Sequence, residues 1–333
     1  MGNFWPTLLA TTLIIVIFFL LNTKSDKGGG NIGFFRRNAG VIGAFLFLCA
    51  GFWLLFMVIL PMTFMVDLSF HHRLPPSQVG GPNDVYTLVN YRQFLFGSAT
   101  QTNSLNGLHL RSFAITIATS VLLTVVNFAV CYPIAFYMAQ KATIGRLRLL
   151  FLLLFVPFWV NDVLRAFAFR ITFSDGGFVN SLLMAAGLVD QPVDFLGSNA
   201  ALYMALCYTS LLVMIFPLYN AIESLDRNQI EAARDLGAPW WHIHLFVVMP
   251  HAKPGIASGM TMCFMLTAGS VAIPQVLEGT RSLWFTQVIY DRFYQLFDWP
   301  QGAAYAFVLV LACTAFVLAM LRISKLKLGE IAR

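Results

Sequence analysis

Asp162 and Arg165 are ionisable residues that lie three positions apart inside a long apolar run, residues 147–173. Side chains at this spacing meet on one face of a helix, so we expect the two to form an ion pair. If the run crosses a membrane, such groups are costly unless they face protein, water or a solute. Two interpretations follow. The pair is either structural, or part of a solute pathway in which the Asp162 carboxylate attracts a cation.

Two aromatic residues precede this pair, and they too could be either structural or part of a solute pathway. Phe158 and Trp159 lie one helical turn or less before Asp162. Aromatic ring faces attract cations, which would suit a pathway. Trp also anchors helices at the membrane–water interface, which is its more common use in membrane proteins. Phe158, Trp159, Asp162 and Arg165 are therefore candidate pathway residues.

The cysteines and histidines do not form a pattern typical of catalysis or metal binding. The 5 cysteines lie singly in different apolar runs, whereas metal and redox sites use close pairs such as C-x-x-C. Neither His71 and His72 nor His242 and His244 have the H-x-x-x-H spacing, and the chain has no G-x-x-x-x-G-K-[ST] phosphate loop. We therefore expect no catalytic residue, no metal and no cofactor. Any ATP and Mg²⁺ would be used by a partner chain.

Residues 231–250, EAARDLGAPWWHIHLFVVMP, form a polar segment between two apolar runs. Asp226 followed by Gln229 resembles a capping box, which predicts a helix that begins near residue 227. Gly237 can adopt the left-handed conformation that ends a helix. Pro239 cannot continue that helix but suits the first turn of a second one. The segment is therefore predicted to fold as a helix, a sharp turn and another helix.

The first of these helices has a distinct pattern of side chains. Ile230, Ala233 and Leu236 recur at helical spacing and form a narrow apolar stripe. Glu231 can pair with an arginine of the same helix, Arg227 or Arg234. The segment is either an amphipathic connector between membrane spans or a docking surface for a partner.

The composition places most of the chain in a membrane. It is 58% hydrophobic and 11% charged, whereas soluble domains hold about 25% charged residues. A helix needs about 20 apolar residues to cross a bilayer, and seven runs are long enough: approximately 4–22, 41–66, 110–140, 147–173, 198–222, 252–274 and 302–322. The runs lack the alternation of barrel strands. We therefore predict an all-α polytopic membrane protein with about seven transmembrane helices.

Basic residues predict the orientation of these helices. They cluster within residues 24–37, 141–148, 227–253 and 322–333. All four clusters lie on one side of a seven-span arrangement, and cytoplasmic segments carry such an excess. We therefore expect the amino terminus outside and the carboxyl terminus in the cytoplasm. Because the net charge of +6 is spread over separate loops, it does not favour nucleic-acid binding.

The first apolar run is predicted to be an extra helix, residues 1–22. Lys24 and Lys27 follow this run, whereas a signal peptide carries its positive charge before its apolar run, so we expect an uncleaved helix. Residues 23–40 include three consecutive glycines and are predicted to form a basic cytoplasmic linker. Residues 41–333 would then form the main domain.

The polar segment resembles the cytoplasmic coupling loop of the permease subunits of bacterial ABC importers. The matching residues stand at the spacing of that loop, while Val247 and Met249 replace its usual Ile and Leu; the matches are Glu231, Ala232, Ala233, Gly237 and Pro250. The resemblance implies a six-helix ABC importer permease core in residues 41–333. Its coupling loop, residues 223–251, would engage an ATPase.

A closer resemblance, to the first permease subunit of spermidine/putrescine-type importers, covers roughly residues 85–322. It is carried by five segments: TLVNYRQFLF at 87–96, PFWVNDVLRAFAFRITFSDGGFVNSLL at 157–183, GLVDQP at 187–192, IEAARDLGA at 230–238 and YDRFYQLFDWPQGAA at 290–304. Polyamine carriers of this family often have an acidic residue near the end of the sixth run. Here the chain has Ser270, which becomes a further candidate pathway residue.

The resemblance implies a multi-pass protein of the bacterial inner membrane that works in a complex. Its partners would be a second permease subunit, an ATPase subunit dimer and an extracytoplasmic solute-binding protein. The expected function is ATP-driven import of a small organic solute, with polyamines such as spermidine and putrescine favoured. Another small organic solute is the main alternative. A secondary transporter is a further one, although the internal repeats common in that class are not visible in this sequence.

Overall fold

The computed structural model describes residues 39–75, 78, 81–82, 84–97, 106–277 and 283–324. The predicted amino-terminal helix, residues 1–22, and nearly all of the predicted linker, residues 23–40, lie outside these ranges. The chain divides into two compact units, residues 1–64 and 65–333, which we describe separately. Every regular element among the described residues is a helix, as the all-α prediction requires.

The described part of the first unit is a single apolar helix. It comprises α3 (Ala39–Leu54), a π-helical turn η1 (Leu55–Ile59) and the start of α4 (Leu60–Ser69). The stretch Gly43–Ser69 has a mean hydropathy of 2.5 and no buried residue in its most apolar window. A helix that is apolar on every side is typical of a membrane span. This confirms the span predicted at residues 41–66.

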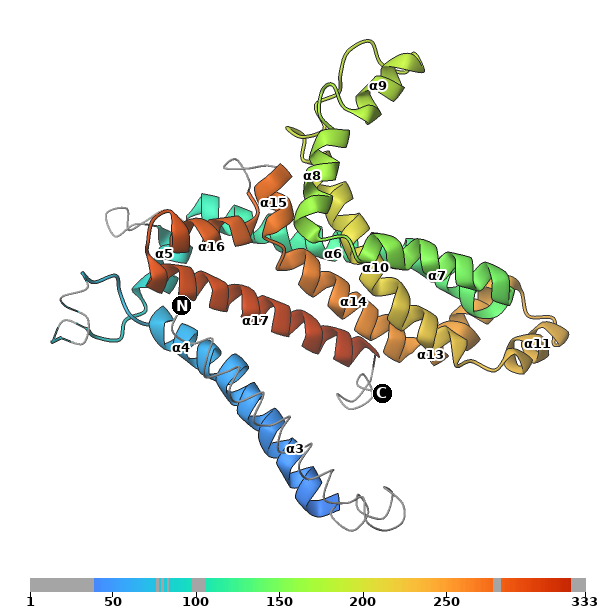
Figure 1. Ribbon diagram of the computed structural model, residues 1–333, viewed down its shortest axis with the longest axis horizontal. Helices are drawn as coiled ribbons and strands as arrows, with labels where there is room; N and C mark the ends of the chain where they lie inside the picture. The colour runs from blue at the N-terminus through green and yellow to red at the C-terminus, as the bar shows by residue number, and fades with distance from the viewer. Residues whose placement is uncertain are drawn as a thin grey trace, which may run out of the picture. The chain divides into compact units, whose positions relative to one another are not determined.

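The second unit is a bundle of long helices with shorter ones at its ends (Figure 1). Its elements are α5 (Val89–Phe96), α6 (Gly107–Phe136), η2 (Tyr137–Lys141), α7 (Ile144–Phe158), α8 (Asp162–Thr172), α9 (Phe178–Ala185), α10 (Ala200–Glu223), α11 (Arg227–Asp235), α12 (Trp240–Ile243), η3 (His244–Val248), α13 (Met249–His251), α14 (Lys253–Ala268), α15 (Ala272–Leu277), α16 (Phe285–Tyr294) and α17 (Trp299–Ser324). Three predicted spans are continuous helices here, at Gly107–Lys141, Ala200–Glu223 and Trp299–Ser324.

Helix α10 lies at the centre of this bundle. It packs against α6 on one side and α14 on another (Figure 1). The contact with α14 is close because Gly255 has no side chain: a Cβ atom there would overlap the Cβ of Ala221 and the carbonyl oxygen of Pro217. Glycine at such a crossing lets two helix backbones approach, as in other membrane bundles.

Two runs predicted as unbroken spans are interrupted, and these expectations were wrong in that respect. In the run 147–173, α7 ends at Phe158 and α8 begins at Asp162, with an angle of 91° between them. Asn161 caps α8 by accepting a hydrogen bond from the Val163 N–H at 2.8 Å, which favours a new helix start there. In the run 252–274, α14 ends at Ala268 and α15 begins at Ala272.

The number of spans follows from these breaks. Among the described residues, four helices are long and apolar enough to cross a membrane, or five if α7 and α8 count as one bent span. α14 alone has 16 residues, which falls short of a full crossing. The seventh predicted run, residues 4–22, lies outside the described residues.

Candidate functional site

Helix α11 opens the polar segment and begins at Arg227, as predicted. Its cap is Asp226, whose side chain accepts a hydrogen bond from the Asn228 N–H at 3.0 Å. Gln229 also bonds Asp226, through its own N–H to the backbone oxygen at 3.1 Å. The cap satisfies backbone donors that a helix start leaves free.

The helix ends in a Schellman turn around Gly237. This glycine has a φ of 79°, which confirms the predicted left-handed conformation. The Gly237 N–H donates to the Arg234 oxygen at 2.9 Å, and the Ala238 N–H donates to the Ala233 oxygen at 3.1 Å. These two bonds define the motif and reverse the chain direction sharply. Pro239 then caps α12, one position earlier than the first-turn placement predicted for it.

One side of α11 packs against the bundle and the other is open. Ile230 and Ala233 pack against the hydrophobic cluster of α6 and α10. Leu236 is 89% exposed, so the predicted apolar stripe does not extend to it. Glu231 is also exposed, and within the described residues it does not form the possible ion pair with Arg227 or Arg234. The open side of α11 therefore carries Glu231 and leads to the exposed Leu236 before the turn at Gly237.

The remaining residues matched to the coupling loop are also accessible. Ala232 and Gly237 are exposed, and Pro250 is exposed in the short helix α13. The exposed set Glu231, Ala232 and Gly237 therefore forms a small-residue surface with one carboxylate, at the end of the bundle where α11 lies (Figure 1).

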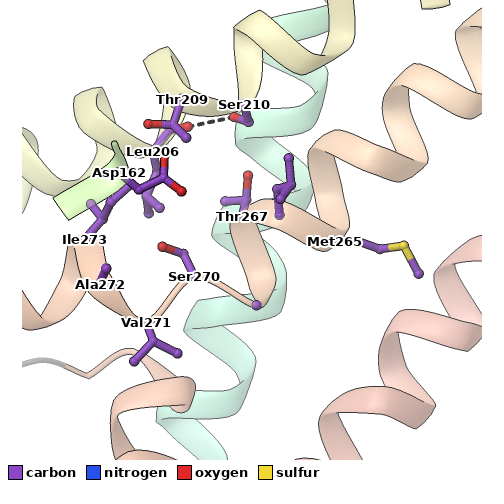
Figure 2. Close-up of a pocket in the computed structure, with 12 residues that line it drawn as sticks. Asp162, Leu206, Thr209, Ser210, Met265, Thr267, Ser270, Val271, Ala272 and Ile273 are labelled. Atoms are coloured by element: carbon purple, nitrogen blue, oxygen red, sulfur yellow. Dashed lines mark hydrogen bonds between the residues drawn. The ribbon is translucent and has the colours of Figure 1, made fainter. Parts of the chain in front are cut away.

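A cavity of about 330 Å³ is lined by two of the candidate pathway residues, Asp162 and Ser270. It lies between the start of α8, the middle of α10 and the break between α14 and α15 (Figure 2). Thr209, Ser210 and Thr267 share its wall with Ser270. The Ser210 and Thr267 hydroxyls donate to the backbone oxygens of Leu206 and Cys263. The other lining residues are Leu206, Met265, Leu266, Gly269, Val271, Ala272 and Ile273. The cavity thus has one carboxylate among hydroxyl and apolar groups.

Arg165 lies behind this wall and holds the bend between α7 and α8. Its Nη1 donates to Asp162 Oδ1 at 3.0 Å, which confirms the predicted ion pair. Its Nη2 donates to the backbone oxygens of Pro157 and Val160 at 3.1 and 2.7 Å. Arg165 is 7% exposed. It therefore satisfies carbonyl oxygens in the bend after α7, where the Pro157 oxygen also accepts from the Val160 N–H at 3.3 Å.

The Asp162 carboxylate remains accessible in spite of this pairing. Its side chain is 63% exposed, and the same Nη1 of Arg165 also donates to Thr209 Oγ1 at 3.2 Å. The bond from Arg165 fixes Oδ1 and orients the carboxylate. Asp162 can accept further hydrogen bonds from a solute in the cavity.

Phe158 and Trp159 lie elsewhere. Phe158 lines a different cavity of about 650 Å³ along α10 and α14, and Trp159 is 81% exposed. The structure therefore brings Asp162 and Ser270 together, with Arg165 behind them, and keeps both aromatic residues out of that cavity. Sequence reasoning missed Thr209, Ser210 and Thr267. Their signal was a polar residue inside an apolar run, but Ser and Thr are common in membrane helices, so hydropathy did not distinguish them.

Comparison with known proteins assigns a family to this architecture. Residues 116–326 match the family model described as binding-protein-dependent transport system inner membrane component. The chain is 31% identical over 274 residues to the spermidine/putrescine transport system permease protein PotB of Escherichia coli (strain K12), covering 82% of this chain and 94% of that protein. The corresponding protein of Haemophilus influenzae is 30% identical over 274 residues, covering 82% of this chain and 91% of that protein.

A solved structure has the same fold. It is the crystal structure of a bacterial ABC transporter involved in the import of the acidic polysaccharide alginate. One of its chains superimposes with a TM-score of 0.66 and 17% sequence identity, covering 87% of this chain and 96% of that chain. The interrupted helices therefore belong to a fold found in another transporter.

Proposed function

Because this chain belongs to the family of binding-protein-dependent transport system inner membrane components, we propose that it carries small organic cations, with spermidine and putrescine favoured. It is a multi-pass permease subunit of an ABC importer. Within the importer, we assign two tasks to its residues. The segment around Glu231 engages the ATPase, and the cavity at Asp162 receives the solute.

The observation that carries the substrate proposal is the accessible carboxylate of Asp162. Protonated amines are hydrogen-bond donors without an acceptor, so they need oxygen atoms around them. The cavity offers that carboxylate together with the hydroxyls of Thr209 and Ser270. Ser270 stands where polyamine carriers of the family often have an acidic residue. Among the described residues, Asp162 is the only carboxylate that lines this cavity. The relative of 31% identity is a spermidine/putrescine permease, in agreement with a cation.

An uncharged small organic solute is the second candidate. Arg165 lies 3.0 Å from the Asp162 carboxylate and offsets part of its charge. A cavity with a compensated carboxylate and several hydroxyls also suits a neutral polar solute. The two candidates differ in how strongly transport depends on the Asp162 charge.

The coupling proposal rests on the exposed, preformed turn at the end of α11. Glu231, Ala232 and Gly237 are accessible, Ala233 lies behind them, and Pro250 is exposed at α13. We assign these residues to contact with an ATPase subunit dimer, where ATP and Mg²⁺ are used. A second permease subunit and an extracytoplasmic solute-binding protein complete the importer. In this arrangement α11 and the carboxyl terminus face the cytoplasm, and the amino terminus lies outside.

Asp162→Asn tests the substrate proposal. The change keeps the shape and removes the charge, so we expect spermidine uptake to fall about two- to fivefold, in line with ~0.4–1 kcal/mol for a partly exposed charge pair. Uptake of labelled spermidine by the assembled importer, normalised to membrane expression, is the measurement. Asp175→Asn is the control, because Asp175 is exposed and does not line the cavity.

Two outcomes would count against the cation proposal. Equal spermidine uptake by Asp162→Asn and wild type would assign Asp162 to the bend alone. If the wild-type importer takes up no polyamine but takes up a neutral solute that its solute-binding protein binds, the second candidate is correct.

A further inference from the structure

A third, smaller cavity lies beneath α11 and shares only Glu231 with the assignments above. Its volume is about 170 Å³, and it is lined by the end of α6, η2, α11, α12 and the start of η3. The polar and charged residues in its wall are Gln140, Lys141, Arg227, Glu231, Arg234 and His244. Three cationic side chains therefore surround this cavity against one carboxylate.

The inner wall of this cavity carries an unused hydrogen-bonding group. His244 is 6% exposed, and its Nδ1 lies 2.7 Å from the Tyr132 hydroxyl. The ring packs against Phe136 and Trp240, with centroid distances of 4.4 Å to each. Nε2 has no hydrogen-bond partner among the described residues. The side chain is nearly buried, and this ring nitrogen is left for whatever occupies the cavity.

The tautomer of the His244 ring decides whether this nitrogen donates. Burial lowers the pKa of His244 from its usual value of 6.5, so the ring is neutral near pH 7. When the Tyr132 hydroxyl donates to Nδ1, the neutral ring carries its proton on Nε2. The cavity then presents an N–H donor together with guanidinium and ammonium donors. A set made mainly of donors, with Arg and Lys among them, suits phosphate oxygens.

The level of the cavity along the bundle indicates the source of the phosphate. Lys141 is the last residue of the 35-residue span Gly107–Lys141. A helix of that length extends about 52 Å, well beyond a hydrocarbon core of about 30 Å. Its end therefore reaches the polar headgroup region. Basic pockets between helices at this depth bind anionic headgroups.

We propose that this cavity binds a phosphate group, and that an anionic phospholipid of the surrounding bilayer supplies it. The phosphate contacts Lys141, Arg227 and Arg234, with His244 donating from the inner wall. Because Glu231 lies in the same wall, the bound headgroup is next to the segment assigned to the ATPase. The lipid therefore orients α11 from the side that faces the bundle.

Lys141→Gln is the principal test, because Lys141 lines the cavity but lies outside the coupling segment. The purified, assembled importer is titrated with phosphatidylglycerol in detergent, and retained lipid is counted by native mass spectrometry. We expect the variant to bind about fivefold less lipid, the effect of one basic residue at a headgroup. Arg227→Gln is a second variant in case the first does not assemble, and Lys141→Arg should restore binding.

Arg146→Gln is the matched control. Arg146 is an exposed basic residue on the neighbouring helix α7 and does not line the cavity. It should retain lipid as wild type does. Equal loss in Lys141→Gln and Arg146→Gln would overturn the proposal, since it would indicate general attraction to basic surface. No loss in either cavity variant would also overturn it.

A parallel titration with inorganic phosphate separates the two sources. If phosphate raises the melting temperature of the wild type but not of Lys141→Gln, and Lys141→Gln also retains less lipid, both the site and its lipid occupant are supported. Stabilisation by phosphate without lipid retention supports the site but overturns the lipid as its occupant. If Lys141→Gln leaves lipid retention unchanged and weakens capture of the ATPase, an acidic partner side chain occupies the cavity and the proposal is wrong.

Discussion

Substitution of Gly237 gives the sharpest test of the coupling assignment. This residue has a φ of 79°, and a Cβ added there would meet no atom within 4 Å. The cost of Gly237→Val therefore comes from the backbone conformation and not from a clash. An L-residue in the left-handed region costs about 1–2 kcal/mol. The population of molecules with the native turn between α11 and α12, relative to those without it, should then fall about 5- to 30-fold.

The chain contains a matched control for this change. Gly187, after α9, has a φ of 68° and equally open space around an added Cβ. Its N–H donates to the Met184 oxygen and the Leu188 N–H donates to the Leu183 oxygen, each at 3.0 Å, so it ends α9 in the same Schellman motif. Gly187→Val has the same backbone cost at a site remote in sequence from α11. Gly237→Asn is a second control, because Asn tolerates this conformation better than other residues.

The assay is capture of the ATPase by the tagged permease, combined with solute uptake, each normalised to membrane expression. We expect Gly237→Val to lose ATPase capture, or to hydrolyse ATP without uptake. Gly187→Val and Gly237→Asn should keep both capture and coupled hydrolysis. If Gly237→Val inserts normally, captures the ATPase and transports at the wild-type rate, the assignment of α11 is refuted. Equal loss of capture in the two valine variants would also refute it.

Two further predictions concern the bend and the orientation. Arg165→Ala should lower the melting temperature of the purified importer, because a carbonyl in the bend that loses its donor, such as that of Val160, costs about 1–3 kcal/mol. An unchanged melting temperature would contradict the role of Arg165 in holding the bend, which was drawn from its bonds to Pro157 and Val160. In a variant without native cysteines, Asp190→Cys should react with a membrane-impermeant maleimide added outside intact cells, while Arg148→Cys should not. The reverse labelling pattern would invert the proposed orientation.

Sequence periodicity and caps predicted the continuous helices well, because both depend on neighbouring residues. The start of α11 at Arg227 follows from Asp226, and its end follows from the one residue type that enters the left-handed region easily, Gly237. Continuous apolar runs likewise predicted the spans at Gly107–Lys141, Ala200–Glu223 and Trp299–Ser324. Such features need no knowledge of distant contacts.

The breaks inside apolar runs could not be predicted in this way. The run around Phe158 is as apolar as a span requires, and Pro157 and Asn161 are the only local signals of a break there. The bend persists because Arg165 donates to carbonyls at the end of α7. The presence of Arg165 in an apolar run predicted its ion pair with Asp162. Its bonds to backbone carbonyls could not be predicted, because they depend on how the chain turns after α7, which hydropathy does not show.

The interpretation of Phe158 and Trp159 as pathway residues depended on their closeness to Asp162 in sequence. In the structure α7 and α8 meet at an angle of 91° between Phe158 and Asp162. Phe158 lines the larger cavity along α10 and α14, and Trp159 is exposed. Conversely, Ser270 is distant from Asp162 in sequence yet shares its cavity, because the break after α14 brings residues 269–273 toward α8. Neither relation follows from spacing.

Helix α10 connects the two proposed sites within this subunit. Thr209 and Ser210 in its first half line the Asp162 cavity, and α11 follows its last turn directly. Gln140 of η2 fixes that last turn by donating to the oxygens of Ile222 and Leu225 at 3.0 and 3.2 Å. From Thr209 to Glu223, α10 extends about 21 Å, so one helix reaches from the cavity toward the segment assigned to the ATPase. ATP can bias the cavity through this helix only if the ATPase contacts α11 differently in two states of the importer, because a partner that binds both states equally shifts neither.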